Sequence, residues 1–258
     1  MIRISVITCT YNAADVLQRT LESVLQQVYP AVEHWIIDGA SADDTVAMAQ
    51  TYARRSAEEA AAHEVHVCSE RDGGLYDAMN KGIEKATGDY LVYLNAGDVF
   101  PSADTLELVA GSVGEGETLP GVLYGDTDVV DAEGQFVRHR RLKAPESLSW
   151  RSFRQGMLVC HQAFYARTEL ARQHPYRLEY RYSADVDWCI RIMKAAGVQG
   201  LPIRNVHGVV ANYLEGGMSV QHHRASLMER FQVMRSHYGL LPTLGMHLWF
   251  LLRSVFKR

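Results

Sequence analysis

The sequence predicts an α/β fold in which helices flank a doubly wound sheet. Strand-like and helix-like segments alternate over the first 98 residues of the 258-residue chain. Residues 90–94 are almost entirely apolar, which is typical of a parallel strand covered on both faces. Polar residues follow the ends of these strand-like segments, where ligands bind in open α/β sheets. A hydrophobic content of 47% is enough for one large domain.

The first half of the chain is expected to form four strands joined by helices. These strands are expected at residues 2–8, 34–38, 65–68 and 90–94. Asn12 stands where it can cap the first helix, whose apolar residues recur at helical spacing. Ser41 with Asp44 resembles a capping box for the second helix.

In the second half of the chain this regular alternation ends. Strands are expected at residues 122–125, 128–140 and 206–213, with a turn near residues 132–134. Helices are expected at residues 145–153, 184–196 and 220–237. The simplest organisation is one domain over residues 1–219, with a nucleotide-binding half (1–98) and an acceptor half (99–219). Residues 220–258 would then form a C-terminal helical segment.

The composition argues against several functional classes. The net charge is -4 and basic residues form no long run, so nucleic-acid binding is not expected. The four cysteines, Cys9, Cys68, Cys160 and Cys189, form no C-x-x-C pair, so neither a zinc site nor a disulfide framework is expected. The N-terminus lacks the pattern of a signal peptide. We therefore expect a protein of the reducing cytoplasm.

The C-terminal residues 240–258 combine many apolar side chains with Arg253, Lys257 and Arg258. The apolar stretch is shorter and more interrupted than the ~20 residues that span a bilayer. It suits an amphipathic helix lying on an anionic membrane, which here would be the inner face of the cytoplasmic membrane. A helix that packs in the core or against a second copy is the alternative, and both interpretations stay open.

Two common nucleotide-binding signatures are missing after the first expected strand. A dinucleotide fold needs G-x-G-x-x-G at this point, and a P-loop needs G-x-x-x-x-G-K-[ST]. The chain instead has TCTYN at residues 8–12. A nucleotide must therefore be held by something other than a glycine-rich cradle.

Four motifs, taken in order, resemble glycosyltransferase family 2. They are SVITCTYN at residues 5–12, IIDGASADDT at 36–45, DGGLYDAMNKG at 72–82 and LNAGD at 94–98. The resemblance runs from about residue 4 to about residue 219 and is greatest to bacterial exopolysaccharide enzymes such as the colanic acid glycosyltransferases. It implies a GT-A fold, that is, a doubly wound mixed sheet flanked by helices, here followed by C-terminal amphipathic helices. It also implies a nucleotide-sugar donor, a divalent cation and inversion at the anomeric carbon.

The motifs imply a donor site along the strand ends. Its expected residues are Thr8, Thr10, Tyr11, Asp38, Asp72, Asp77, Asn80, Lys81, Asn95 and Gly97. Tyr11 can stack on a base, and a carboxylate at Asp38 can accept from a base N–H or a ribose hydroxyl. Helix capping is the alternative role for Asp38. Asp77 and Lys81 are four residues apart on an expected helix, so a solvated ion pair is their alternative.

The metal motif departs from the family pattern. Many members carry D-x-D-D, whereas this chain has Asn95, Ala96, Gly97 and Asp98. Asp98 is therefore the expected ligand of Mg²⁺ or Mn²⁺, which would neutralise the leaving diphosphate. With one protein carboxylate, we expect weak metal binding when no nucleotide is present.

An inverting transfer also needs a group that removes the proton from the acceptor hydroxyl. The segment around residues 182–191 resembles the family's base motif, and Asp185 is the expected general base. Asp187 is the competing candidate, and helix capping is the alternative role for Asp185. His161 and Gln162 are expected on the acceptor side, although His161 can equally be a core residue. Gly217 and Met218 belong to an expected mobile loop over the cleft.

The leading hypothesis is an inverting glycosyltransferase that acts on a saccharide acceptor, most simply one linked to a lipid. A sugar-nucleotide nucleotidyltransferase shares the fold class, but it should have a glycine-rich basic loop after the first strand. A non-catalytic nucleotide-sugar-binding or scaffold protein is the third interpretation. Such a protein would have no use for a base at Asp185.

Overall fold

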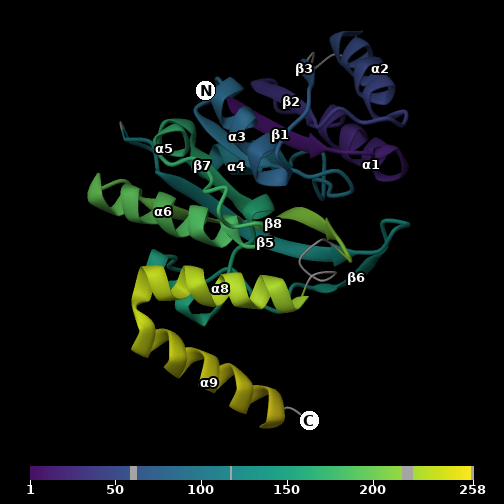
Figure 1. Ribbon diagram of the computed structural model, residues 1–258. Helices are drawn as coiled ribbons and strands as arrows, with labels where there is room; N and C mark the ends of the chain where they lie inside the picture. Colours follow the sequence, from purple (N-terminus) through teal and green to yellow (C-terminus); the bar gives the residue numbers. More distant parts are fainter. Residues whose placement is uncertain (59–62, 117, 217–222, 257–258) are drawn as a thin grey trace.

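The computed structural model describes residues 1–58, 63–116, 118–216 and 223–256, excluding the side chains of residues 223 and 251–256. A mixed sheet of eight strands forms its centre, and helices flank the sheet (Figure 1). The α/β fold that the sequence predicts, with helices at the C-terminus, is confirmed.

The first half of the chain forms the parallel part of the sheet. Its elements are β1 (Ile4–Thr10), α1 (Ala14–Leu25), β2 (Val32–Asp38), α2 (Thr45–Glu58), β3 (Glu64–Ser69), α3 (Leu75–Lys85) and β4 (Tyr90–Tyr93). The strands lie in the order β3-β2-β1-β4, and each neighbouring pair is parallel. Their carboxyl ends therefore meet at one edge of the sheet, which is where an α/β sheet binds ligands.

The second half extends the same sheet with antiparallel strands. Its elements are α4 (Thr105–Gly111), β5 (Val122–Val130), β6 (Phe136–His139), the 3₁₀ helices η1 (Trp150–Gln155) and η2 (His161–Ala163), β7 (Phe164–Arg167), α5 (Thr168–Gln173), α6 (Ala184–Val198) and β8 (Ile203–Leu214). Strand β7 pairs antiparallel with both β4 and β5, and β8 pairs parallel with β5. The sequence prediction omits α4, β7 and α5, which have only 7, 4 and 6 residues and therefore little periodicity.

The prediction of a helix at residues 145–153 is wrong. Only η1, which begins at Trp150, is helical there, and the side chains of Ser149 and Ser152 form its capping box. The carbonyl groups of Pro145 and Glu146 instead accept hydrogen bonds from the Tyr124 hydroxyl. These long-range contacts use carbonyl groups that a helix would need for its own hydrogen bonds.

The prediction that Asn12 caps the first helix is also wrong. Helix α1 begins at Ala14, and its backbone N–H donates to Asp43 Oδ2 over 3.1 Å. Asp43 Oδ1 accepts from the backbone N–H of Thr45, where α2 begins. One exposed carboxylate therefore satisfies the first turns of two helices, a contact that local spacing does not reveal.

The capping box expected from Ser41 and Asp44 does not form either, because α2 begins only after Asp44. The Ser41 hydroxyl accepts from the backbone N–H of Asn12 and donates to the Asp38 carboxylate. Ser41 therefore links the carboxyl ends of β1 and β2 instead of starting a helix.

The C-terminal segment consists of α8 (His223–Tyr238) and α9 (Leu240–Phe256). Helix α8 packs on α6, and α9 leads away from the body of the molecule (Figure 1). Over residues 240–250, α9 exposes apolar side chains, which are Leu240, Leu241, Leu244, Leu248 and Trp249. None of the helices, over the part of the chain that is described, has both the length and the apolar character to cross a membrane.

Helix α3 packs against the central strand β1 at a glycine. A Cβ atom on Gly82 would lie 2.6 Å from Ile7 Cγ2, and the Ile7 side chain is fully buried and β-branched. Gly82→Ala is therefore expected to lower the free energy of unfolding by about 1–3 kcal/mol, because a tightly packed core resists added atoms. Urea denaturation measures this change.

Gly197 on α6 provides the matched control, because no atom lies within 4 Å of a Cβ built there. Gly197→Ala is expected to raise the free energy of unfolding by roughly 0.5–1 kcal/mol, the usual preference for alanine in a helix. Equal effects at the two glycines would contradict the close approach of α3 to β1.

Candidate functional site

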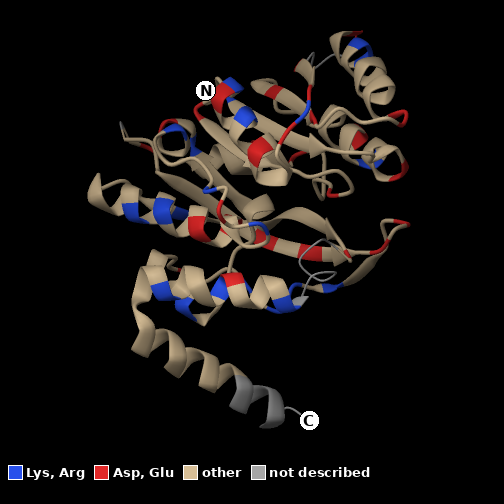
Figure 2. Cartoon of the chain, in the orientation of Figure 1, with Lys and Arg blue, Asp and Glu red and all other residues tan. Residues whose placement is uncertain are grey.

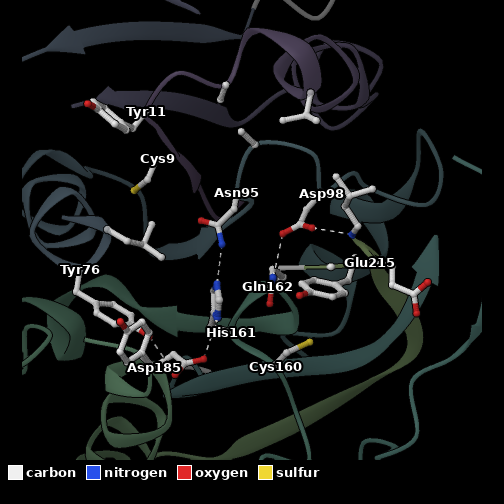
Figure 3. A pocket seen from close by; sticks show the side chains of 18 of the residues that line it. Cys9, Tyr11, Tyr76, Asn95, Asp98, Cys160, His161, Gln162, Asp185 and Glu215 are labelled. Atoms are coloured by element: carbon white, nitrogen blue, oxygen red, sulfur yellow. Dashed lines mark hydrogen bonds and ion pairs between the residues drawn. The ribbon is translucent and has the colours of Figure 1, made fainter. Parts of the chain in front are cut away.

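A cleft of about 680 Å³ opens where the carboxyl ends of β1 and β4 face β8 and the first turn of α6 (Figure 3). Its volume lies within the range of about 300–1,000 Å³ that is typical of small-molecule sites. Among the residues that the sequence analysis selects, those that line the cleft are Tyr11, Asn95, Asp98, His161, Gln162 and Asp185. They come from four separate segments of the chain.

Asp98 lines the cleft and is only 3% exposed. Its Oδ2 accepts from Gln162 Nε2 over 2.9 Å, and its Oδ1 accepts from the backbone N–H of Leu214 over 3.0 Å (Figure 3). Burial raises the pKa of Asp98 to about 6, and the two hydrogen bonds oppose this shift. A buried carboxylate that is ionised at neutral pH favours a nearby positive charge.

Within the cleft, His161 joins Asn95 to Asp185 (Figure 3). Its Nε2 lies 3.0 Å from Asn95 Nδ2, and its Nδ1 lies 3.4 Å from Asp185 Oδ2. Since Asn95 Nδ2 is a donor, His161 Nε2 accepts from it, and the N–H on Nδ1 is directed toward Asp185. Asn95 Oδ1 is buried and has no hydrogen-bond partner within the described chain.

Asp185 lies in the first turn of α6 and lines the cleft. Its Oδ1 accepts from the backbone N–H of Val186 over 2.9 Å and from the Tyr76 hydroxyl over 3.4 Å. Burial raises the pKa of Asp185, but the hydrogen bond and electrostatic interaction with His161, with a smaller effect of the Arg230 charge, more than offset it, so the pKa lies below its usual value. Asp185 is therefore an ionised carboxylate at neutral pH, held by three donors.

Asp187, the competing base candidate, points elsewhere. Two residues along a helix differ by about 200° in direction, so Asp187 turns away from the cleft when Asp185 faces it. Its side chain is fully buried and pairs with Arg191 Nε at 2.6 Å and with His237 Nε2 at 2.8 Å. These ion pairs connect α6 to α8, and both carboxylate oxygens of Asp187 are engaged away from the cleft.

On the donor side, Tyr11 follows β1 and is 68% exposed at the cleft. Thr8 and Thr10 lie beneath it and are buried. The Thr8 hydroxyl donates to the Leu94 carbonyl over 2.7 Å, and Thr10 donates to Asp38 Oδ1 over 3.0 Å. The structure thus gives both threonines contacts that hold strand ends together.

Asp38 is buried and accepts four hydrogen bonds, which come from the side chains of Thr10, Ser41 and Ser69 and from the backbone N–H of Ser41. Burial raises the pKa of Asp38, but these hydrogen bonds lower it more, so the net pKa lies below its usual value. These contacts join strand ends and the loop after β2, so Asp38 does not act as a helix cap, which was the alternative role from the sequence.

Four further predicted donor residues lie outside the lining of the cleft and hold α3 and the loop before it in place. Asp72 and Asp77 accept from the backbone N–H groups of Gly74 and Gly73, both over 2.8 Å. Asn80 bonds both backbone polar groups of Tyr176, and Lys81 pairs with Glu70 at 3.0 Å. Lys81 thus forms an ion pair with Glu70 instead of the expected pair with Asp77.

Gly97 lies beneath the cleft in the left-handed region, with φ 98°. A Cβ atom there would lie 2.6 Å from Leu214 Cδ2, so the position requires glycine where β8 passes the turn after β4. Gly217 and Met218, which the sequence assigns to a mobile loop, lie outside the described residues.

The sequence analysis missed other residues that line the cleft, which include Tyr76, Arg140, Tyr182, Glu215 and Arg230. It also missed Glu229, whose carboxylate accepts from the backbone N–H groups of residues 181–183 at 2.6–3.0 Å. No local motif marks these side chains. Only the packing of α8 on α6 brings Glu229 and Arg230 to the segment that precedes Asp185.

The Asp98 carboxylate, which lines the cleft, is the protein ligand type that Mg²⁺ and Mn²⁺ prefer. The unpartnered Asn95 Oδ1 points away from Asp98 (Figure 3), so Asp98 is the carboxylate that fits a divalent cation here. Another acidic group, Glu33 with Glu64 and His66, lies at the amino ends of β2 and β3, away from the cleft. Arg3 forms ion pairs with both of its glutamates.

Comparison with known proteins agrees with this architecture. The family model of glycosyl transferase family 2 matches residues 5–173. A "PGL/p-HBAD biosynthesis glycosyltransferase" of Mycobacterium bovis is 37% identical over 217 residues, which cover 83% of this chain and 78% of that protein.

Two solved structures share the fold at low sequence identity. The S. aureus TarS structure with UDP-GlcNAc matches with a TM-score of 0.69 at 19% identity, covering 90% of this chain and 64% of that one. A Pyrobaculum calidifontis mannosyltransferase with GDP-Man and Mn²⁺ matches with a TM-score of 0.57 at 16% identity, covering 99% of this chain and 81% of that one.

Proposed function

Since the chain belongs to glycosyltransferase family 2, we propose that it is an inverting hexosyltransferase. It would move a sugar from a nucleotide diphosphate sugar to a saccharide acceptor in bacterial surface or exopolysaccharide synthesis. The observation that carries the proposal is that two carboxylates, Asp98 and Asp185, line one cleft and are separated by Gln162 and His161 (Figure 3). An inverting displacement needs two separate groups of this kind, one for the leaving diphosphate and one for the base.

In this proposal, Asp185 is the general base that takes the proton of the acceptor hydroxyl. His161 and Tyr76 contact its two oxygens and fix their direction. Asn95 in turn holds the His161 ring through Nε2. Because the pKa of Asp185 lies below its usual value, the carboxylate is ready to accept a proton throughout the neutral range.

Asp98 would hold a divalent cation, which when bound would neutralise the diphosphate that leaves with the nucleotide, and Asn95 Oδ1 would be free to accept from the ribose or the sugar. Gln162 and the backbone of Leu214 keep the Asp98 carboxylate in place. The Mn²⁺ in the mannosyltransferase structure supports a metal in this fold, although it does not choose between Mn²⁺ and Mg²⁺ here.

The nucleotide would lie along the ends of β1 to β3, with Tyr11 stacked on the base. Asp38 and Asp72 remain our candidates for the base and ribose, while Thr8, Thr10, Asp77, Asn80 and Lys81 would hold the surrounding strands and loop in place. The two solved structures contain a uridine and a guanosine nucleotide sugar, so the fold accommodates either base.

We assign residues 1–219 to the transferase domain and residues 220–258 to a segment that meets the membrane carrying a lipid-linked acceptor. Over residues 240–250, α9 has no Lys, Arg, Asp or Glu (Figure 2), and it exposes five apolar side chains. This exposure argues against the core-packing alternative for that part of α9. It suits an interfacial helix with the basic residues Arg253, Lys257 and Arg258 at its end.

A donor screen by thermal shift tests the proposed function. We expect sugar nucleotides of one base, among UDP-, GDP- and dTDP-sugars, to raise the melting temperature more with Mn²⁺ than without it. A ligand at about 100 times its Kd stabilises the folded state by about 2.7 kcal/mol. Asp98→Asn is expected to remove the Mn²⁺-dependent part of the shift, since it removes the charge that the cation needs.

Asp44→Asn, an exposed carboxylate outside the cleft, is the matched control and should keep the wild-type shift. A wild-type protein that responds to no sugar nucleotide would contradict the proposed function. A Mn²⁺-dependent shift that survives Asp98→Asn would contradict the metal assignment alone.

A further inference from the structure

Arg230 on α8 lines the cleft and has no assigned role. Its Nε is buried and has no hydrogen-bond partner within the described chain. A buried N–H donor without a partner is costly, because it has lost its water without gaining an acceptor. Such a group is poised to bind an anion that enters the cleft.

The position of Arg230 is fixed by its neighbour. Glu229 accepts from the backbone N–H groups of Arg181, Tyr182 and Ser183, directly before α6. The Ser183 hydroxyl also donates to the Ser226 carbonyl on α8. These hydrogen bonds hold α8 against the first turn of α6, so Arg230 faces the cleft from a rigid element.

Arg230 lies close to Asp185. Its neighbour Glu229 accepts from the backbone N–H of Ser183, two residues before Asp185, and the positive charge of Arg230 is among the causes that lower the pKa of Asp185. Tyr182 lines the cleft together with Arg230 and Asp185, and an aromatic side chain of this kind can pack against a sugar ring. The leaving diphosphate would lie beside Asp98.

We propose that Arg230 forms an anion subsite for the acceptor, which binds a phosphate or carboxylate group attached to the accepting sugar. This inference rests on the proposed function and names the acceptor class: a sugar whose anionic group lies beside the hydroxyl that attacks. A guanidinium binds both anions through two parallel N–H donors, and the diphosphate of a lipid-linked sugar places such a group next to the first sugar.

The test compares three acceptor probes on the full-length chain. These probes are N-acetylglucosamine on undecyl diphosphate, the neutral undecyl N-acetylglucosaminide, and undecyl glucuronide. Binding is measured with Mn²⁺ and the nucleoside diphosphate found in the donor screen, so that the donor site is already filled. The variants are Arg230→Gln, Arg230→Lys and the control Arg235→Gln, which removes an exposed charge further along α8.

We expect the wild type to bind an anionic probe at least about 10-fold more tightly than the neutral probe. Arg230→Gln should bring this ratio close to one, Arg230→Lys should keep part of it, and Arg235→Gln should leave it unchanged. A preference for the diphosphate identifies the lipid-linked phosphate as the anion, and a preference for the glucuronide identifies a uronic acid.

The inference would be overturned if Arg230→Gln still preferred the anionic probe over the neutral probe by the wild-type ratio. So would a loss of nucleotide binding in Arg230→Gln with an unchanged acceptor ratio, which would place Arg230 on the donor side. Failure of the proposed function is visible separately, because the wild type would then bind no sugar nucleotide in the donor screen.

Discussion

Asp185→Asn is expected to lower the rate of sugar transfer by about 10²–10⁴-fold, the usual contribution of a general base. The amide has nearly the shape of the carboxylate but cannot take the acceptor proton. Nucleotide binding should persist, because Asp185 is separated from Asp98 by His161 and Gln162 (Figure 3). Transfer rates, together with the thermal shift by the donor nucleotide, measure both effects.

Glu215→Gln is the matched control for Asp185→Asn. Glu215 is another carboxylate that lines the cleft, but its side chain is 51% exposed and pairs with Arg138. We expect its transfer rate to stay within a few fold of the wild-type rate. A transfer rate equal to wild type in Asp185→Asn would rule out the base assignment and would favour a scaffold or binding role for the site.

Asp187→Ala is expected to have the largest effect on stability, a loss of about 3–5 kcal/mol in the free energy of unfolding. Arg191 is 12% exposed and His237 is 8% exposed, so removing Asp187 leaves buried polar groups without their carboxylate. The substitution also removes one contact between α6 and α8, because His237 is the α8 partner of Asp187. Urea denaturation at neutral pH measures the change.

The contribution of Asp187 should depend on pH in a defined direction. Burial raises the pKa of Asp187, but the hydrogen bond from His237 and the charge of Arg191 lower it more, so the net pKa lies below the ordinary value of 3.8. A carboxyl with a lowered folded-state pKa stabilises fully above its unfolded pKa and loses this contribution as pH falls through the folded pKa. The difference between wild type and Asp187→Ala should therefore be constant near pH 6 and shrink below about pH 4.

Asp128→Ala serves as the control for this stability prediction. Asp128 pairs with His139 at 2.8 Å, but the His139 side chain is 68% exposed. Surface pairs of this kind contribute about 0–1 kcal/mol. A loss in Asp187→Ala that is no greater than the loss in Asp128→Ala would contradict the buried-pair argument. If Asp187→Ala folds and still transfers sugar, Asp187 is also excluded as the competing base.

Much of the parallel half of the fold was predictable because its signals are local. The apolar runs that predict strands at residues 2–8, 34–38, 65–68 and 90–94 correspond to β1, β2, β3 and β4, with ends shifted by a few residues. The helical periodicity of α1, α3 and α6 is equally visible in the sequence. Caps were predicted poorly, because Asp43 reaches two helix starts through a turn that spacing alone does not describe.

The second half of the sheet was less predictable. Strand β7 has four residues, and its partners β4 and β5 lie far from it in the chain, so no local period identifies it. In the segment before η1, the carbonyl groups of Pro145 and Glu146 accept hydrogen bonds from the Tyr124 hydroxyl, and the helix that the sequence favours there does not form. In both places a long-range contact outweighs local propensity.

The sequence by itself determined the family, through four motifs in order, and it selected both Asp98 and Asp185 as candidates for chemistry. Only the tertiary structure decided that these carboxylates face one cleft while Asp187 turns into an ion pair between helices. It also decided that His161 joins Asn95 to Asp185, and that Arg230 enters the site from α8. The reason is physical: periodicity and capping act between residues a few positions apart, whereas the site is formed by strand order and helix packing between distant segments.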